Sequence, residues 1–209
     1  MGFENHKLKD SIDFGPEMHL RFGVYKTKGV SDKKVEKIFN GMKEELEAYA
    51  IKPEVAWIRD FKRGGFFFKS IFDSIIMGGA KIEKPCDRNL YLVEKNLGDY
   101  LWGLSLLPEI SGAVDTMTHS LMYLSADQGF SRGPVGVAKH EVLHACGCEQ
   151  GLAMNGSYEI IKKLKNAKSE CDEINPFEDF FPGYYAGNPK KGIKPRIYFT
   201  RESVNKRFE

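Results

Sequence analysis

His140-Glu141-Val142-Leu143-His144 is the stretch that decides which fold and which chemistry this chain is expected to have. Residues four apart lie on one face of a helix, so both imidazoles can reach a single ion. The glutamate projects about 100° away from the first histidine and can hold a water molecule bound to that ion. The chain has five histidines, and two of them fall at this spacing. The pattern therefore predicts a helix that binds a metal, the alternative being two ordinary histidines.

Zinc is the metal that this pattern favours. A catalytic zinc site keeps three protein ligands and a water molecule, and His140 and His144 supply two of the ligands. Zinc lowers the pKa of its water to about 7, so hydroxide is available at neutral pH. Glu141 is then expected to act as the general base and to pass the proton to a leaving amine, a role typically worth about 10²–10⁴-fold in rate.

Three neighbouring features strengthen the prediction. Gly147 follows the second histidine by three residues, and glycine can adopt the left-handed conformation that ends a helix and turns the chain. Met154 comes soon afterwards, in Met154-Asn155-Gly156-Ser157. The segment Ala113–Ser125, just before the helix, is expected to be an extended edge strand on which a peptide substrate pairs by strand addition.

On these residues the chain resembles the metzincin clan of zinc peptidases, and within it the archaemetzincins most. The resemblance covers roughly residues 17–175, and its specific part is His140 to Gly147 with the turn at Met154. It implies an α+β, zincin-like domain in which a mixed twisted sheet carries a backing helix and an active-site helix. It also implies zinc-dependent hydrolysis of peptide bonds by zinc-bound water, with Glu141 as the general base.

The chain departs from the family at the third zinc ligand. Where the family has a histidine three residues after the glycine, this chain has Gln150, whose amide oxygen is a weaker donor than imidazole. We expect Gln150 to be the third contact, and the alternatives stay open. They are a carboxylate further along the chain, as in the gluzincin clan, an adjacent side chain, or water or no metal; the residues concerned are Glu159, Glu170, Asp172, Glu173, Cys148 and Glu149.

Archaemetzincins also hold a second, structural zinc through four cysteines. Here Cys171 falls close to the first of those cysteines, but Ile174 occupies the approximate place of the last. We therefore expect one Zn²⁺ per chain and no second structural zinc.

Two further side chains are candidates for a role in the site. Tyr158 lies four residues after Met154 and could donate to an oxyanion, as tyrosines near this turn do in some metzincins, or could simply pack at a helix start. His119 could touch a substrate on the expected edge strand, although a structural role is the favoured interpretation.

Composition narrows the classes of partner and compartment. The 209 residues carry a formal net charge of +2, which gives no reason to expect nucleic acid. The longest apolar stretch, Phe66–Met77, is interrupted by polar residues and is too short to span a bilayer. No signal peptide is visible, and four cysteines are too few for a disulfide framework at this size. We expect a soluble, reduced, cytoplasmic protein whose partner is a peptide or protein substrate.

Periodicity supplies the expected elements. Alternating apolar residues from Met18 predict a strand, and apolar residues at helical spacing after Ser31, its expected N-cap, predict a helix that ends at Pro53. Further strands are expected around 55–58, 90–93 and 197–199, and helices over 135–146, which starts near Pro134, and 157–171. Residues 175–189 are expected to form an ordered loop.

These elements predict one zincin-like catalytic domain over residues 1–209. Residues 1–147 would form an N-terminal lobe with the sheet and the zinc helix, and residues 148–209 a smaller C-terminal lobe. Two rival functions remain: a zincin-fold binding or regulatory module that binds metal weakly, and a gluzincin-type peptidase. Glu141 argues against the binding module, because a purely structural zinc site has no use for a general base.

Overall fold

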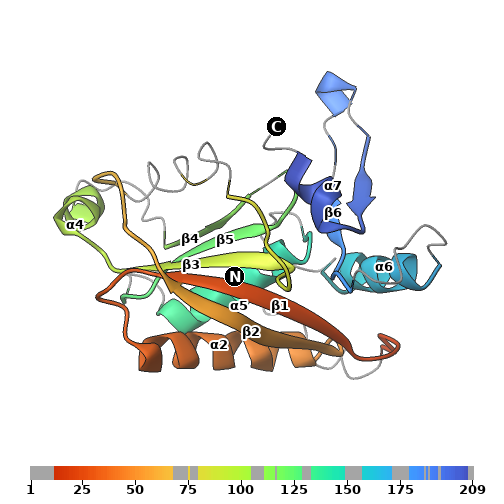
Figure 1. Ribbon diagram of the computed structural model, residues 1–209, viewed down its shortest axis with the longest axis horizontal. Helices are drawn as coiled ribbons and strands as arrows, with labels where there is room; N and C mark the ends of the chain where they lie inside the picture. Colours follow the sequence, from red (N-terminus) through yellow and green to blue (C-terminus); the bar gives the residue numbers. More distant parts are fainter. Residues whose placement is uncertain are drawn as a thin grey trace.

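The computed structural model combines a five-stranded sheet with helices packed against it (Figure 1). It describes residues 12–67, 75, 80–104, 111–115, 117–128, 133–148, 157–170, 179–185, 187, 189–192 and 194–206. The elements are β1 (Met18–Lys26), α2 (Asp32–Glu47), β2 (Ile51–Asp60), β3 (Arg88–Val93), α4 (Leu97–Leu104), β4 (Gly112–Val114), β5 (Leu121–Ser125), α5 (Pro134–Ala145), α6 (Ser157–Glu170), β6 (Gly183–Tyr185), a 3₁₀ turn (Pro189–Lys191), β7 (Arg196–Tyr198) and α7 (Arg201–Asn205). The chain is therefore a mixed α+β fold, as expected.

The main sheet is mixed, with strand order β2-β1-β3-β5-β4. The first four of these strands run parallel, and β4 pairs with β5 in the antiparallel direction. Strands β6 and β7 form a separate two-stranded antiparallel sheet. The antiparallel strand β4 therefore lies at one edge of the main sheet, next to β5.

The central strands β3 and β5 are buried on both faces. Leu90, Leu92, Met122 and Leu124 enter the core on the helix side, together with apolar residues of α2 and α5. The alternate residues, such as Tyr91 and Tyr123, enter a second core on the opposite side with Phe180, Tyr198 and Val204. Burial on two faces explains why 90–93 is a continuous apolar run rather than an alternating one.

Helix α2 backs the sheet beside the metal-motif helix α5. Its N-cap is Ser31, whose hydroxyl accepts the backbone N–H of Lys34, as the sequence predicts. Gly41 lets the two helices approach closely, because a Cβ there would stand 2.5 Å from Cγ1 of Val135 in α5. The helix ends at Glu47, earlier than expected, and Pro53 already belongs to β2.

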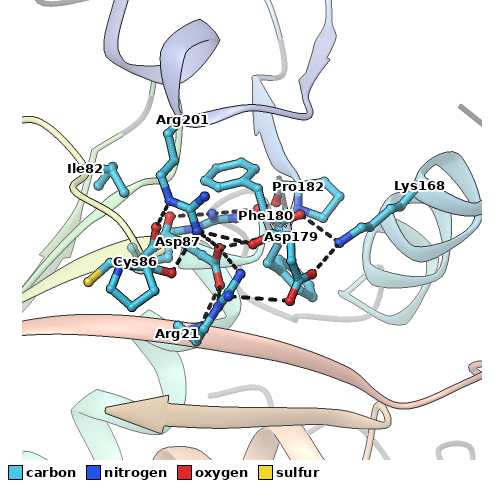
Figure 2. A network of polar contacts seen from close by, with 12 residues as sticks. Arg21, Ile82, Cys86, Asp87, Lys168, Asp179, Phe180, Pro182 and Arg201 are labelled. Atoms are coloured by element: carbon cyan, nitrogen blue, oxygen red, sulfur yellow. Dashed lines mark hydrogen bonds and ion pairs between the residues drawn. The ribbon is translucent and has the colours of Figure 1, made fainter. Parts of the chain in front are cut away.

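A buried polar network ties the C-terminal segments to the amino end of β3 (Figure 2). The carboxylate of Asp87 accepts from the guanidinium groups of Arg21 and Arg201, each at 3.1 Å, and from the backbone N–H of Phe181 at 3.1 Å. Asp87 is fully buried, and both arginines are at least four fifths buried. This carboxylate therefore links β1, the segment before β6 and α7.

The structure corrects one expected element that matters for the site. Residues Ala113–Ser125 do not form one strand: β4 ends at Val114, a turn follows, and β5 begins at Leu121 as an interior strand. The side chain of Asp115 accepts several backbone N–H groups in the turn and so ends the strand. The edge strand is thus β4 alone.

Smaller differences concern the remaining segments. The region 175–189 was expected to be a loop but contains strand β6, and most of the apolar stretch Phe66–Met77 lies outside the described residues. The helix over 157–170 and the strand over 196–198 confirm the corresponding predictions. Among the helices that the structure describes, none is both long and apolar enough to cross a bilayer.

Candidate metal centre

The metal-motif helix α5 begins at Pro134 and ends in a glycine turn. Pro134 occupies the first helical position, where its missing N–H costs nothing. At the other end Gly147 has φ +88°. Its N–H donates to the carbonyl of His144 at 2.8 Å, and the N–H of Cys148 donates to that of Leu143 at 3.1 Å. These two bonds form a Schellman motif, as the left-handed conformation of Gly147 allows.

Gly147 is also required by its neighbour in the small sheet. A Cβ at this position would lie 2.7 Å from Cβ of Tyr184 in β6. Both the backbone conformation and the packing therefore call for glycine. The prediction that Gly147 stops the helix is confirmed.

His140 and His144 face each other across one turn of α5. Their Nε2 atoms are 3.2 Å apart, and the ring planes are nearly perpendicular. Two nitrogen ligands of a tetrahedral zinc, each about 2.0–2.1 Å from the ion, would be about 3.3 Å apart. The separation of the two Nε2 atoms, at which the rings also form a direct hydrogen bond, therefore fits a shared zinc ion.

A backbone carbonyl fixes the orientation of His144. Nδ1 of this ring lies 2.7 Å from the carbonyl oxygen of Cys148. Because a carbonyl only accepts, Nδ1 must carry the proton, which leaves the lone pair of the neutral ring on Nε2. Metal-binding histidines characteristically have such a partner on the other ring nitrogen. The hydrogen bond from Nδ1 of His144 to the carbonyl of Cys148 thus also fits a role of His144 as a metal ligand.

The side chain of Glu141 lies between the backbone of α5 and the edge strand β4. The residue is 8% exposed, so its carboxyl group is positioned by packing as well as by its place on the helix. Gly112 of β4 lies directly against it: a Cβ on Gly112 would meet Cγ of Glu141 at 2.6 Å and Cγ1 of Val137 at 2.6 Å. The edge strand and the predicted general base are therefore in close contact.

His119 contacts the helix end from the turn between β4 and β5. Its Nδ1 lies 2.6 Å from the carbonyl oxygen of His144 and donates to it. The residue is 7% exposed, and burial lowers the pKa of its ring, which favours the neutral form. A structural role for His119, rather than contact with a substrate, is what this geometry supports.

Arg88 donates a hydrogen bond to another carbonyl at the same end of α5, that of Ala145. The side chain is completely buried at the start of β3, and its Nε donates to the carbonyl of Ala145 at 2.9 Å. Its remaining donors reach further backbone carbonyls, those of Asp87, Phe181 and Pro182. A positive charge at a helix C-terminus is also favourable to the helix dipole.

The structure does not describe the residue expected as the third ligand. Gln150 and Met154 lie outside the described residues, as do Glu149, Asp172 and Glu173. Tyr158 and Glu170 belong to α6, but their side chains are likewise not described. Among the described side chains, no third His, Cys, Asp or Glu joins His140 and His144.

Two of the alternative ligands, Glu159 and Cys148, are among the described residues, and neither has its side chain in a group of metal-binding residues with the two histidines there. Glu159 lines a surface hollow with Ile12, Lys162, Lys163 and Ile197. Cys148 is 2% exposed and meets His144 through its backbone carbonyl. Cys86, Cys146 and Cys148 are buried and form no disulfide within the described part of the chain, and burial raises the pKa of Cys146 to about 12.

The supporting residues around the site were only partly visible in the sequence. Gly112, Asp115 and Arg88 were not predicted to have a role there. A signal for the turn exists in Asp115, Thr118 and Ser120, which favour side-chain hydrogen bonds to nearby backbone. Comparison with known proteins adds no further information, because no family model and no curated protein matches the chain.

Proposed function

We propose that this protein is a zinc-dependent metallopeptidase with a zincin-like fold, similar to the metzincins. The single observation that supports this most is the pairing of His140 and His144, whose Nε2 atoms are 3.2 Å apart while Nδ1 of His144 is bound by a carbonyl. A mixed sheet with a backing helix, α2, and an active-site helix, α5, agrees with the same proposal.

His140 and His144 would hold one Zn²⁺, and Gln150 is proposed as the third contact. Zinc, when bound, makes a water molecule acidic enough to supply hydroxide near neutral pH. Glu141 follows His140 on the helix and is held against Gly112, so its carboxylate would be fixed in place before substrate binds. It would accept a proton at that carboxylate and deliver it to the amine that leaves when the peptide bond is cleaved.

The substrate is proposed to be an extended peptide segment. Strand β4 is at the edge of the sheet, its three residues are partly exposed, and Gly112 brings it next to Glu141. An extended chain can pair with such an edge through its backbone, which positions a peptide bond without regard to its side chains. The edge strand proposed here is shorter than the one expected from the sequence.

The proposal is tested by metal content and peptide cleavage measured on the same preparations. The wild type should retain about one zinc per chain, and either His140→Ala or His144→Ala should lose it. Glu141→Gln should keep the zinc but lose cleavage of a mixed peptide library by about 10²-fold or more. Glu36→Gln, which changes an exposed acid of α2, is the matched control and should behave as the wild type.

The other outcomes separate the rival functions. A zinc-loaded wild type that cleaves no peptide in the library would favour the binding module. Loss of zinc on changing a single downstream acid, with Gln150→Ala harmless, would favour the gluzincin arrangement. Retention of zinc by both histidine variants would contradict the proposal altogether.

A further inference from the structure

The turn between β4 and β5 has a strained residue at its tip. His119 has φ +55°, a left-handed backbone conformation that is uncommon for any residue other than glycine. Strain of this kind persists only where the surroundings enforce it, and it concentrates at functional sites. His119 is also buried, so its conformation is not a consequence of a loose surface loop.

Asp115 enforces this conformation. Its carboxylate accepts the backbone N–H groups of Thr118, Ser120 and Leu121 at 2.7–2.9 Å. Its backbone carbonyl accepts the N–H of His119 at 3.1 Å. Asp115 itself follows directly after β4, and Leu121 opens β5, so the turn is fixed to both strands.

The ring of His119 donates to the carbonyl of His144, which also accepts a hydrogen bond in the turn that ends α5. The carbonyl oxygen of His144 receives Nδ1–H of His119 at 2.6 Å and the N–H of Gly147 at 2.8 Å. The Gly147 turn in turn places the Cys148 carbonyl on Nδ1 of the His144 ring. Hydrogen bonds, connected through the backbone of Gly147 and Cys148, therefore link the turn after β4 to the ring of the proposed ligand.

We propose that His119 is a positioning residue for the metal centre: held by Asp115, it fixes the carbonyl of His144 and with it the orientation in which that imidazole meets the metal. This inference rests on the proposed function, because it gives His119 a role toward the same zinc ion. It also joins β4, the strand proposed to bind the substrate, to the ligand-bearing end of α5. Residues that support a metal ligand in this way typically contribute about 10–100-fold to metal affinity.

The test compares three variants. His119→Phe keeps an aromatic ring but cannot donate. His119→Asn places an amide N–H the same number of bonds from the backbone as Nδ1 and tolerates the left-handed conformation. His19→Phe, an exposed histidine of β1, is the matched control.

For each protein, zinc affinity is measured by chelator competition, the visible spectrum is recorded with Co²⁺ in place of zinc, and metal-free stability is measured in urea. His119→Phe should bind zinc about 10–100-fold more weakly and show a shifted Co²⁺ spectrum, whereas His119→Asn and His19→Phe should match the wild type. A folded His119→Phe variant with wild-type affinity and spectrum would overturn the inference. A wild type that binds no zinc would instead remove the proposed function.

A second measurement is independent of metal and of any variant's folding. Ring nitrogen NMR of the metal-free wild type should show His119 with its proton on Nδ1, as donation to the His144 carbonyl requires. A proton on Nε2 would mean that the hydrogen bond does not form, and the positioning role would be lost with it.

Discussion

Nδ1 of His144 and the carbonyl oxygen of Cys148, four residues later, are 2.7 Å apart. The chain brings them together by turning at Gly147, whose φ of +88° lets the backbone double back on the helix it has just left. The glycine of the motif therefore supports His144 itself. This gives Gly147 a measurable role that does not depend on which residue is the third ligand.

Replacing Gly147 with alanine should weaken both the fold and the proposed metal site. A left-handed alanine costs about 1–2 kcal/mol, and its Cβ would also stand 2.7 Å from Cβ of Tyr184. Because the turn carries the Cys148 carbonyl, we expect zinc affinity to fall by about 10–100-fold as well. Urea unfolding and chelator competition measure the two effects.

The matched control is Gly136→Ala, in the same helix. A Cβ there meets nothing within 4 Å, and the position is helical and exposed, so alanine should stabilise by up to about 1 kcal/mol. Equal zinc affinity for Gly147→Ala and Gly136→Ala would show that the turn does not support the His144 ring.

Arg88→Met should destabilise the protein strongly. The guanidinium group is the donor to four buried backbone carbonyls, among them that of Ala145 at the end of α5. Each acceptor left without a donor costs about 1–3 kcal/mol, so a loss above about 3 kcal/mol in the free energy of unfolding is expected. Arg59→Met, which removes an exposed ion pair with Glu83, should cost less than about 1 kcal/mol. Similar losses for the two variants would contradict the role assigned to Arg88.

The helix of the candidate site, α5, and the helix that packs beside it, α2, could be predicted because their signals are local. Ser31 caps α2 through its own side chain, and Pro134 and Gly147 bound α5 at the positions where proline and glycine are favoured. The spacing of His140 and His144 follows from helix geometry alone. Such features depend on residues a few positions apart, which the sequence displays directly.

The support of the site depends on contacts between distant residues and could not be predicted in the same way. Arg88 binds carbonyls, and a carbonyl is the same for every residue type, so its partners leave no trace in the sequence. The break at Asp115 was missed because Met117, His119, Leu121 and Tyr123 recur at every second position, as the residues on one face of a strand do. There, side-chain acceptance of backbone N–H groups outweighed the tendency to form a strand.

Asp127 should make stability depend on pH in the acid range. Burial opposes ionisation of its carboxyl group, but hydrogen bonds from Lys34 Nζ at 2.7 Å and Lys95 N–H at 2.8 Å outweigh burial and lower the pKa. An acid with a depressed pKa in the folded state stabilises the fold above its unfolded pKa, about 3.9, and loses that contribution as the pH falls through the folded value.

Asp127→Asn should therefore lower the free energy of unfolding by about 1 kcal/mol near neutral pH, and the difference from the wild type should shrink below about pH 4. Urea unfolding at a series of pH values measures this, with Asp60→Asn on the exposed end of β2 as the control. A difference that stays constant down to the lowest pH would mean that the charge of Asp127 is not what stabilises the fold.

Gly112→Ala should separate metal binding from catalysis. Its Cβ would lie 2.6 Å from Cγ and 3.0 Å from Cδ of Glu141, so the carboxyl group of the proposed base must move. The three atoms nearest to this Cβ belong to Glu141 and Val137 rather than to His140 or His144, so zinc affinity should stay near the wild-type value. Displacement of a reacting group by about 1 Å can cost about 10²-fold in rate, so kcat for a peptide that the wild type cleaves should fall by about that factor.

Gly64→Ala, with nothing within 4 Å of its Cβ, should leave both zinc affinity and kcat unchanged. An unchanged kcat for Gly112→Ala would mean that the position of Glu141 against β4 is not needed for cleavage, and loss of zinc would mean that β4 supports the ligands rather than the base.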